Sequence, residues 1–389
     1  MKRPKYCRCA FALGFAVLLA TPLSAAEMHP YRPGTGEGGQ LKIVNGIPVL
    51  IVQGSPEEMG RQQAALVGDI IKRLLPLPRL ILQAREGDAA WAGAAGVAAT
   101  IISHASERHR SELDAMAAAM TATADQKASL AVGNVLAELR RFKRCSALLV
   151  EPERSATGQV LFGRNYDFAT FGVLDRLGLV TVYRPNGCHA FASVGYPASI
   201  GVLSGMNDAG LALACLDSGP AKDNSPPLDP RGAPMLLSFR RVLEECATIA
   251  EAEKLLRQTR HTTWFNLAVC DREQAVVFEI TARHVAVRRS EDHLLASTNH
   301  FRTDELGVGA RSPRYAKLSE YWKREKPFAW TDVAQAMHDV NMGNTTLQTM
   351  VFEPDSLILR LSLYRRPASA GPLVRLELKD LFSPGKVRE

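Results

Sequence analysis

The pattern of the chain changes at Cys145, and this change limits the possible folds more than any other feature. Residues 88–144 are rich in Ala, Leu, Met and charged residues with few Gly or Pro, which is typical of helices. From Cys145 onward, short apolar runs alternate with turn residues, which indicates strands. These strands come in two batches with helices between them. We therefore expect an α+β fold in which one sheet packs on another and helices lie outside.

The expected strands are rich in Val, Leu, Ile and Ala and are bounded by turn residues; they cover 145–151, 160–164, 179–184, 189–195, 211–216, 263–270, 275–280, 285–289, 293–297 and 356–363. Helical spacing predicts helices at 111–120, 125–142, 235–246, 249–257, 312–321 and 331–340. Asn45-Gly46 predicts a hairpin turn within 41–53. Ser55, followed by Pro56 and two glutamates, predicts the start of a further helix.

Residues 1–26 have the organisation of a secretory signal peptide, with a basic start, a short apolar stretch and small residues at the cleavage position. We expect cleavage after Ala26 and a secreted or periplasmic protein. The alternative, a membrane anchor, is disfavoured because the apolar stretch is shorter than the roughly 20 residues that span a bilayer. We therefore expect no stable membrane insertion. The formal net charge is +7, and four basic residues of this peptide carry more than half of it, so we expect no nucleic-acid partner.

Five cysteines follow the predicted signal peptide: Cys145, Cys188, Cys215, Cys246 and Cys270. An odd number in an exported protein leaves at least one thiol unpaired. Two of them lie within apolar runs, where a free cysteine acts as a small hydrophobic residue. The spacing of Cys and His residues matches no metal site, so we expect neither metal nor cofactor. Cys145 is the natural candidate for the unpaired thiol, although counting alone does not select it.

A catalytic role for Cys145 requires a base, because the thiolate attacks and a free thiol has a pKa of about 8.5. The chain shows no Cys/His protease signature. Cleavage of the Arg144–Cys145 bond would supply an α-amine with a pKa of about 7.7–8.0, tethered to the thiol. Arg164 would favour the thiolate and Asp167 would orient the amine. Residues three apart on a regular strand face opposite sides, which predicts that the strand ends or bulges at Asn165.

Three more residues are candidates for the site, and each also has a simpler interpretation. Asn207 lies in a turn bracketed by glycines, and Asn299 ends an expected strand. Either amide would donate to the oxyanion that forms when a thiolate attacks a carbonyl, although the turn is also a common one. Arg314 follows a helix start at Ser312 and would by default be solvated. The simpler interpretation of Arg164 and Asp167 is a surface ion pair beside a hairpin.

The order of these motifs resembles a known superfamily. Cys145 followed by GRNYDF (163–168), GMNDAGL (205–211), TNHF (298–301) and SPRY (312–315) is similar to the N-terminal-nucleophile hydrolases of the choloylglycine hydrolase and penicillin acyltransferase type. Upstream, GSPEEMGRQQ (54–63) resembles a segment of the acyl-coenzyme A:6-aminopenicillanic-acid acyltransferase branch, the C45 peptidase type. The resemblance covers roughly residues 41–365.

The resemblance implies an αββα four-layer sandwich and a precursor that cuts itself before the cysteine. Residues 27–144 would form a mostly helical pro-segment and residues 145–389 the catalytic domain, giving the two chains of an α/β heterodimer after cleavage. The enzyme would cleave a linear amide of a small N-acylated substrate through a thioester, and pass the acyl group to water or another acceptor. No oligomeric state follows from the sequence.

The resemblance also implies a role for each candidate residue. Cys145 would be the nucleophile and, through its amine, the base. Arg164 and Asp167 would hold and polarise it. Asn207 and Asn299 would serve the oxyanion, the first partly through its turn backbone. Arg314 would support the site electrostatically. Phe168, Phe171, Val173 and Leu174 suggest an apolar acyl pocket, or equally a piece of core, and the loop 220–234 would form another wall.

The sequence departs from the family pattern just before the cysteine. Residues 141–144 form the bulky basic run RFKR, where self-cutting relatives often have a small or acidic residue. The bond before Cys145 could therefore break by an N-to-S acyl shift, be cut by a trypsin-like protease, or stay intact. The last case defines an alternative function: an exported ligand-binding protein on the same fold, uncut and without enzymatic activity.

Overall fold

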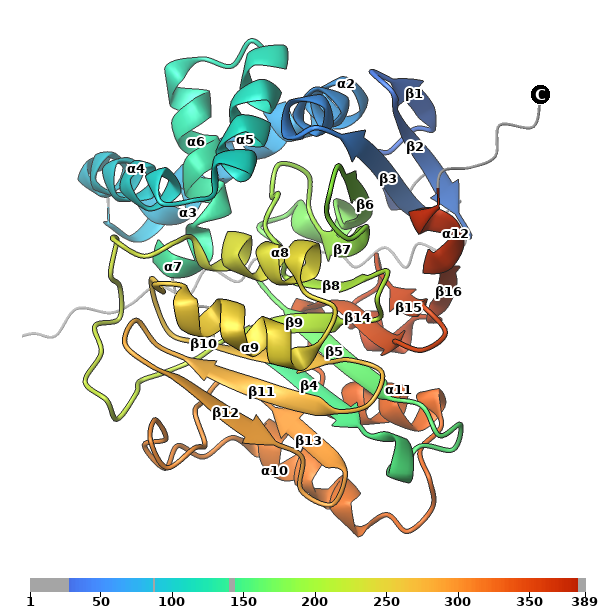
Figure 1. The fold of residues 1–389 in the computed structure, drawn as a ribbon. Helices are drawn as coiled ribbons and strands as arrows, with labels where there is room; N and C mark the ends of the chain where they lie inside the picture. Colours follow the sequence, from blue (N-terminus) through green and yellow to red (C-terminus); the bar gives the residue numbers. More distant parts are fainter. Residues whose placement is uncertain (1–27, 87, 140–143, 384–389) are drawn as a thin grey trace, which may run out of the picture.

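A computed structural model describes residues 28–86, 88–139 and 144–383 (Figure 1). The predicted signal peptide and residues 141–143 of the basic run lie outside the described residues. The described chain forms two stacked β-sheets with helices on their outer faces. This confirms the α+β class and the αββα sandwich expected from the sequence.

The larger sheet, sheet A, has ten strands, and every neighbouring pair is antiparallel except β3 with β6. In spatial order its strands are β1 (Gly34–Gly36), β2 (Gly39–Val44), β3 (Ile47–Gly54), β6 (Leu179–Pro185), β7 (Phe191–Gly195), β8 (Ser204–Asn207), β9 (Ala212–Asp217), β10 (Phe265–Cys270), β11 (Ala275–Ile280) and β12 (Val285–Arg289). The turn between β2 and β3 is Asn45-Gly46, with φ of 51° and 85°, which confirms the predicted hairpin.

The smaller sheet, sheet B, has six antiparallel strands and carries Cys145. In spatial order they are β13 (Leu294–Ser297), β4 (Cys145–Val150), β5 (Leu161–Asp167), β14 (Thr346–Glu353), β15 (Ile358–Ser362) and β16 (Val374–Glu377). Strands β14 and β16 were not expected from the sequence. β14 is central, because it pairs with β5 on one side and β15 on the other.

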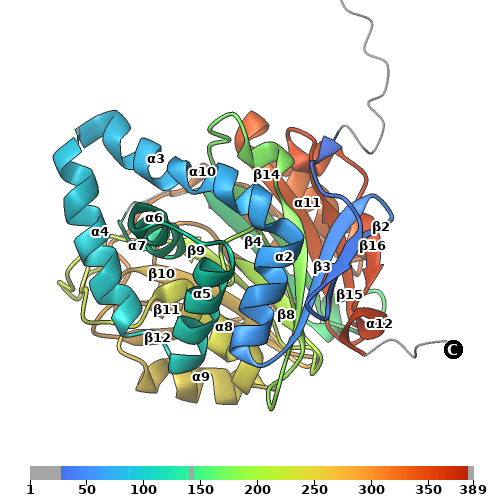
Figure 2. The same cartoon turned by 90° about the horizontal axis from the view of Figure 1, so that it is seen from above.

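Two groups of helices lie on the outer side of sheet A, and part of each group packs directly on its strands. The first precedes Cys145: α2 (Pro56–Leu74), α3 (Pro76–Glu86), α4 (Asp88–Ser103), α5 (Glu107–Ala119), α6 (Ala124–Asn134) and α7 (Leu136–Leu139). The second is α8 (Met235–Glu245) and α9 (Ile249–Gln258). In Figure 2, α3, α4 and α6 lie on one side of α2, and β2, β3 and β16 lie on the other. The single helix expected at 125–142 is in fact broken after Asn134.

On the outer face of sheet B lie α10 (Pro313–Ser319) and α11 (Trp330–Asp339), and α12 (Leu378–Phe382) closes one end of the core between the sheets. Helix α2 begins where the sequence predicted, with Ser55 accepting from the N–H of Glu58 and the Glu58 carboxylate accepting from Ser55. The segment before Cys145 is mostly helical, as expected, but it also supplies β1, β2 and β3. Because β3 pairs with β6, this segment is built into sheet A.

Candidate active site

Cys145 is the first residue of β4, with β13 and β5 as the neighbouring strands. Its side chain faces the core between the two sheets and is 5% exposed, whereas Arg144 just before it is exposed. In the pairing of β4 with β5, Cys145 stands opposite Tyr166 and Ala147 opposite Arg164. Residues opposite each other share a face of the sheet, so the Cys145, Tyr166 and Arg164 side chains lie on the same inner face.

The peptide bond between Arg144 and Cys145 is held on both of its polar atoms. The N–H of Cys145 donates to Oδ1 of Asn299 at 2.8 Å. The carbonyl oxygen of Arg144 accepts from the N–H of Asp167 at 3.3 Å. This bond therefore has a fixed orientation next to the thiol, and a donor points at the oxygen that would become negative if the thiol attacked.

Arg164 is fully buried and joins the two sheets. Its Nη2 donates to the carbonyl oxygen of Cys215 on β9 at 2.8 Å, and its Nε donates to Oγ of Ser204 on β8 at 3.2 Å. Burial raises the pKa of the Cys145 thiol, and the charge of Arg164 is the strongest influence in the opposite direction. Arg164 is thus positioned to stabilise a thiolate, and the alternative of a surface ion pair is wrong.

Asp167 ends β5 and lies 1% exposed at the end of the sheet. Its Oδ1 accepts from Oγ1 of Thr346 at 2.5 Å, while its Oδ2 has no hydrogen-bond partner among the described residues. Burial raises the pKa of Asp167 to about 6, against the opposing effects of the Thr346 hydrogen bond and the Arg314 charge.

The expected end or bulge of the strand at Asn165 is wrong. β5 pairs regularly with β4 from Leu161 to Tyr166, and the irregularity lies in β14, between Thr346 and Gln348. The bulge was predicted on the assumption that Arg164 and Asp167 both reach the Cys145 thiol. Instead, Arg164 lies on the thiol side of the sheet, and Asp167 lies at the strand end, beside the peptide bond that precedes the thiol.

Asn299 and Arg314 meet each other and Cys145. The Arg314 Nη2 donates to Oδ1 of Asn299 at 2.8 Å, and its Nη1 donates to Oγ of Ser146 at 2.8 Å and to the carbonyl oxygen of Cys145. The Asn299 Nδ2 donates to the carbonyl oxygen of Asp217 at 2.6 Å. Asn299 thus presents an acceptor, not a donor, to Cys145. The Ser312 hydroxyl caps α10 as expected, and burial lowers the pKa of Arg314.

Asn207 does not join the site. Its Nδ2 donates to the carbonyl oxygens of Leu243 and Cys246, at 3.0 and 2.7 Å, and its Oδ1 accepts from the N–H of Leu211. Its own backbone N–H donates to the oxygen of Leu211. The side chain faces α8 on the outer side of sheet A, where it ties the end of that helix to the turn. The expected oxyanion role of Asn207 is therefore corrected to a structural one.

Thr346 is a residue of this site that sequence reasoning missed. It holds one oxygen of Asp167 although the two residues are 179 positions apart in the chain. No motif surrounds it, because the contact depends on the pairing of β14 with β5. Ser204, the partner of Arg164, was missed for the same reason: it reaches the site only because the two sheets are stacked.

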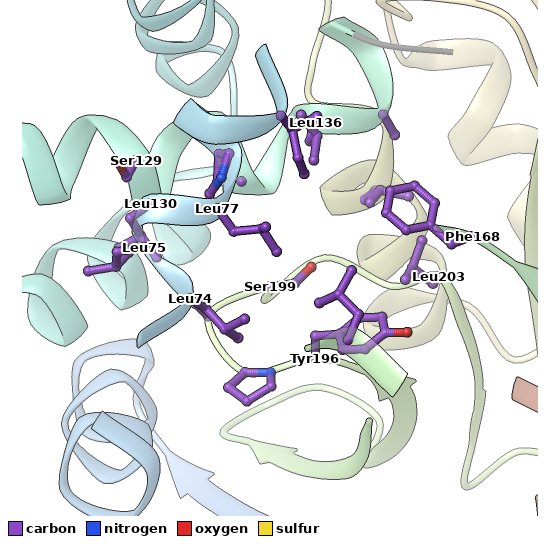
Figure 3. A pocket seen from close by; sticks show the side chains of 18 of the residues that line it. Leu74, Leu75, Leu77, Ser129, Leu130, Leu136, Phe168, Tyr196, Ser199 and Leu203 are labelled. Atoms are coloured by element: carbon purple, nitrogen blue, oxygen red, sulfur yellow. The ribbon is translucent and has the colours of Figure 1, made fainter. Parts of the chain in front are cut away.

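A pocket of about 140 Å³ lies beside the site (Figure 3). Its lining residues lie within 74–81, 129–137, 166–174 and 196–203, together with Leu236, and most are apolar. Tyr166, which stands opposite Cys145, forms part of its wall. Of the four residues suggested for an acyl pocket, Phe168 and Leu174 line it. Phe171 and Val173 do not; they are 40% and 39% exposed, and the loop 220–234 contributes no wall.

Among the described residues, one group could hold a metal ion: Glu151, Glu153 and His293. It lies at the opposite end of β4 from Cys145, and His293 Nδ1 is 3.3 and 3.2 Å from the two carboxylates. It therefore takes no part in the site around the thiol. Within the same described ranges, no helix has the length and apolar composition needed to cross a bilayer.

The stacked sheets and this arrangement around Cys145 define the class of N-terminal-nucleophile hydrolases. The family model of acyl-coenzyme A:6-aminopenicillanic acid acyl-transferase matches residues 154–363, and the chain belongs to this family. The match includes Arg164, Asp167, Asn299 and Arg314 and begins after Cys145. The chain is accordingly an amidohydrolase or acyltransferase acting on carbon–nitrogen bonds other than peptide bonds, which argues against a non-enzymatic binding protein.

Several solved structures are similar at low identity. An ortholog of N-acylethanolamine-hydrolyzing acid amidase from Caenorhabditis elegans is 17% identical, with 54% of this chain and 93% of that chain covered and a TM-score of 0.43. A mutant of a conjugated bile acid hydrolase from Clostridium perfringens is 13% identical, covering 62% and 95%, with a TM-score of 0.43. Penicillin V acylase from Agrobacterium tumefaciens is 14% identical, covering 56% and 83%, with a TM-score of 0.40. No curated protein matches.

Proposed function

We propose that this protein is an exported enzyme that cuts its own chain before Cys145 and then cleaves a linear amide of a small N-acylated substrate through a thioester on that residue. The observation that carries the proposal is the geometry of the Arg144–Cys145 bond. The N–H of this bond donates to Asn299, and its carbonyl oxygen accepts from the N–H of Asp167. The Cys145 thiol that follows the bond lies beside the buried Arg164. A bond held in this way favours attack by the neighbouring thiol.

In the cutting step, the sulfur of Cys145 attacks the carbonyl carbon of Arg144, and the charge on its oxygen is stabilised by the N–H of Asp167. The carbon–nitrogen bond then breaks, and the leaving nitrogen takes up the proton that the thiol has lost. Arg144 is now joined to the sulfur as a thioester. Water hydrolyses this thioester, which leaves a carboxylate on Arg144 and a free thiol and α-amine on Cys145.

The basic run before Cys145 fits this step. The contacts that hold the bond are to its backbone atoms, and the residue Arg144 itself is exposed. A bulky side chain at this position therefore does not have to enter the site. The small or acidic residue often found before the cysteine in self-cutting relatives is not required by this geometry.

After cutting, the α-amine of Cys145 takes the thiol proton and acts as the base. Asp167 offers its unpartnered Oδ2 and Asn299 its Oδ1 to the resulting ammonium group, and Arg164 stabilises the thiolate. The thiolate attacks the amide carbonyl of the substrate, the amine product leaves with a proton from the ammonium group, and water or another acceptor then removes the acyl group. We assign Asn299 to the orientation of the amine, because its Nδ2 is engaged by Asp217.

The pocket supports an apolar acyl group as the part of the substrate that is bound. It is lined mainly by Leu, Pro, Ala and aromatic side chains, and its wall includes Tyr166, the cross-strand neighbour of the nucleophile. A panel of amides that share one amine and differ in the acyl group, assayed with the cut protein, would define the acyl preference.

The cutting step has a direct test by mass spectrometry of the denatured protein. The wild-type chain should give a fragment of 245 residues that begins at Cys145, because 144 of the 389 residues precede it. Cys145→Ala should stay uncut and inactive, and Cys188→Ala, which removes another free cysteine, should be cut normally. An uncut chain that remains active with Cys145→Ala would refute the proposal.

One further variant separates self-cutting from cutting by a trypsin-like protease. Arg144→Ala removes the basic residue that such a protease needs, but it leaves the backbone contacts of the bond unchanged. We expect this variant to be cut at the same position. If it stays uncut while the wild type is cut, another protease performs the step.

A further inference from the structure

The pocket contains a polar feature that an acyl group made only of carbon and hydrogen would leave without a partner. Ser199 lines the pocket and is partly exposed, and its hydroxyl has no hydrogen-bond partner among the described residues. Figure 3 shows the Ser199 side chain between Leu74, Leu77 and Leu203, with its oxygen toward the middle of the pocket. A hydroxyl group covered by an apolar ligand loses its water without gaining a hydrogen bond, which weakens the binding of that ligand.

A second hydroxyl lies in the same turn. Tyr196 also lines the pocket, and its oxygen is buried without a hydrogen-bond partner among the described residues. Burial raises the pKa of this hydroxyl, and the nearby Gln348 side chain opposes the rise. The two groups nevertheless do not form a well-aligned hydrogen bond, and both polar atoms of the Gln348 amide are also unpartnered. Polar groups without partners are uncommon in buried positions, and a bound ligand or water that supplies the missing partner is one explanation for them.

The turn that carries both hydroxyls is held in a conformation that residues other than glycine rarely adopt. Ala198 has a φ of +71°. The buried Asn134, at the end of α6, holds both sides of this residue: its Nδ2 donates to the oxygen of Ala198 at 2.9 Å, and its Oδ1 accepts from the N–H of Ile200 at 3.0 Å. Backbone strain of this kind persists where surrounding contacts impose it, and it often marks a functional site.

We infer that this pocket selects acyl groups that carry an oxygen substituent, such as a hydroxyl, keto or ether group, and that the Ser199 hydroxyl is the specificity-determining contact. Asn134 is a positioning residue, because it fixes the turn without lining the pocket. Tyr196 supplies a second hydroxyl at the same wall. The inference rests on the proposed function, since it assumes that the pocket beside Cys145 receives the acyl group of the substrate.

The test compares amides of one amine with octanoic acid and with its 3-, 5- and 7-hydroxy derivatives, using the cut enzyme. We expect at least one hydroxy derivative to have a higher kcat/KM than the octanoyl amide. The Ser199→Ala variant should lower this preference by about 3- to 10-fold, the range expected for one hydrogen bond. The Ser103→Ala variant makes the same chemical change on α4, outside the pocket lining, and should leave the preference unchanged.

A second measurement does not depend on turnover. The uncut Cys145→Ala protein should bind the preferred free hydroxy acid more tightly than octanoic acid, and Ser199→Ala should remove the difference. The inference is overturned if no hydroxy derivative is preferred, or if Ser103→Ala lowers the preference as much as Ser199→Ala does. A protein that is never cut and turns over no amide would refute the proposed function instead, and the binding comparison would still decide the role of Ser199.

Discussion

The carboxyl group of Asp167 allows a quantitative test of the electrostatics of the site. It is 1% exposed and accepts one hydrogen bond, from Thr346. Burial raises its pKa from 3.8 to about 6. In the unfolded chain the same carboxyl group titrates near its ordinary value. Between these two pH values, the folded protein therefore keeps a proton that the unfolded chain has lost.

A raised carboxyl pKa makes the folded state less stable as the pH rises through this window. Well below pH 3.8, Asp167 is protonated in both states and does not change the free energy of unfolding. Above about pH 6 it is ionised in both states, and its burial lowers the free energy of unfolding by the full amount. A shift from 3.8 to about 6 corresponds to roughly 3 kcal/mol in total, of which about 2.4 kcal/mol develops between about pH 4 and about pH 8. Asp167→Asn removes this titration, so its stability relative to the parent should increase by that amount across the same range.

The measurement is urea unfolding, followed by tryptophan fluorescence, at several pH values in the uncut Cys145→Ala background. In this background no α-amine forms beside Asp167. Asp223→Asn is a control of opposite sign: burial alone would raise the pKa of Asp223, but hydrogen bonds from Thr281 and Ser225 lower it. That variant should lose relative stability as the pH rises, mainly below about pH 4–5, where the Asp223 carboxyl of the unfolded chain titrates. A stability difference for Asp167→Asn that stays constant with pH would show that burial does not control this group.

Three further predictions concern contacts around and behind the site. Arg314→Met should slow the cutting of the chain by at least tenfold, because it removes a charged group that holds Cys145 and Asn299. Mass spectrometry over time measures this rate, and Arg311→Met, at an exposed position, should leave it unchanged. Thr346→Val should lower the free energy of unfolding by about 1–3 kcal/mol at pH 8 and by less at pH 4, where Asp167 is protonated, as measured by urea unfolding. Arg240→Met leaves two buried glutamates without their cation, and should cost about 3–5 kcal/mol in the same assay.

The fold class could be predicted because it depends on local patterns. The change from helical to strand patterning at Cys145, the turn Asn45-Gly46 and the helix start at Ser55 are each encoded by a few neighbouring residues. The break of the predicted helix after Asn134 was missed, and it falls at a residue that makes a tertiary contact. The Asn134 side chain is used to hold the turn around Ala198, and no local signal announces this contact.

The candidate site was predicted in part, and its errors have a common cause. Arg164, Asp167, Asn299 and Arg314 do surround Cys145, but the side toward which each residue points depends on how the sheets are stacked. Asn207 ends β8 with its side chain toward α8, a direction that spacing along the chain does not reveal. Thr346 reaches Asp167 only through the pairing of β14 with β5.

The segment before Cys145 has contacts that favour its retention after the chain is cut. Strand β3 pairs with β6 over six residues, so removing the segment would open sheet A. On the outer face, Glu112 of α5 forms a buried ion pair with Arg240 of α8 at 2.7 Å, and His109 of α5 meets Glu244 at 2.8 Å. Separation would expose these charges and an apolar core that the two parts share.

The same segment also forms part of the predicted acyl pocket. Residues of α2, α3, α6 and α7 supply about half of its wall, and Asn134 fixes the turn that carries Ser199. The cut at Cys145 therefore frees an amine without dividing the pocket from the nucleophile. The two chains should therefore copurify after cutting. Denaturants that separate them should abolish amide cleavage, even though Cys145, Arg164 and Asp167 all lie in the larger chain.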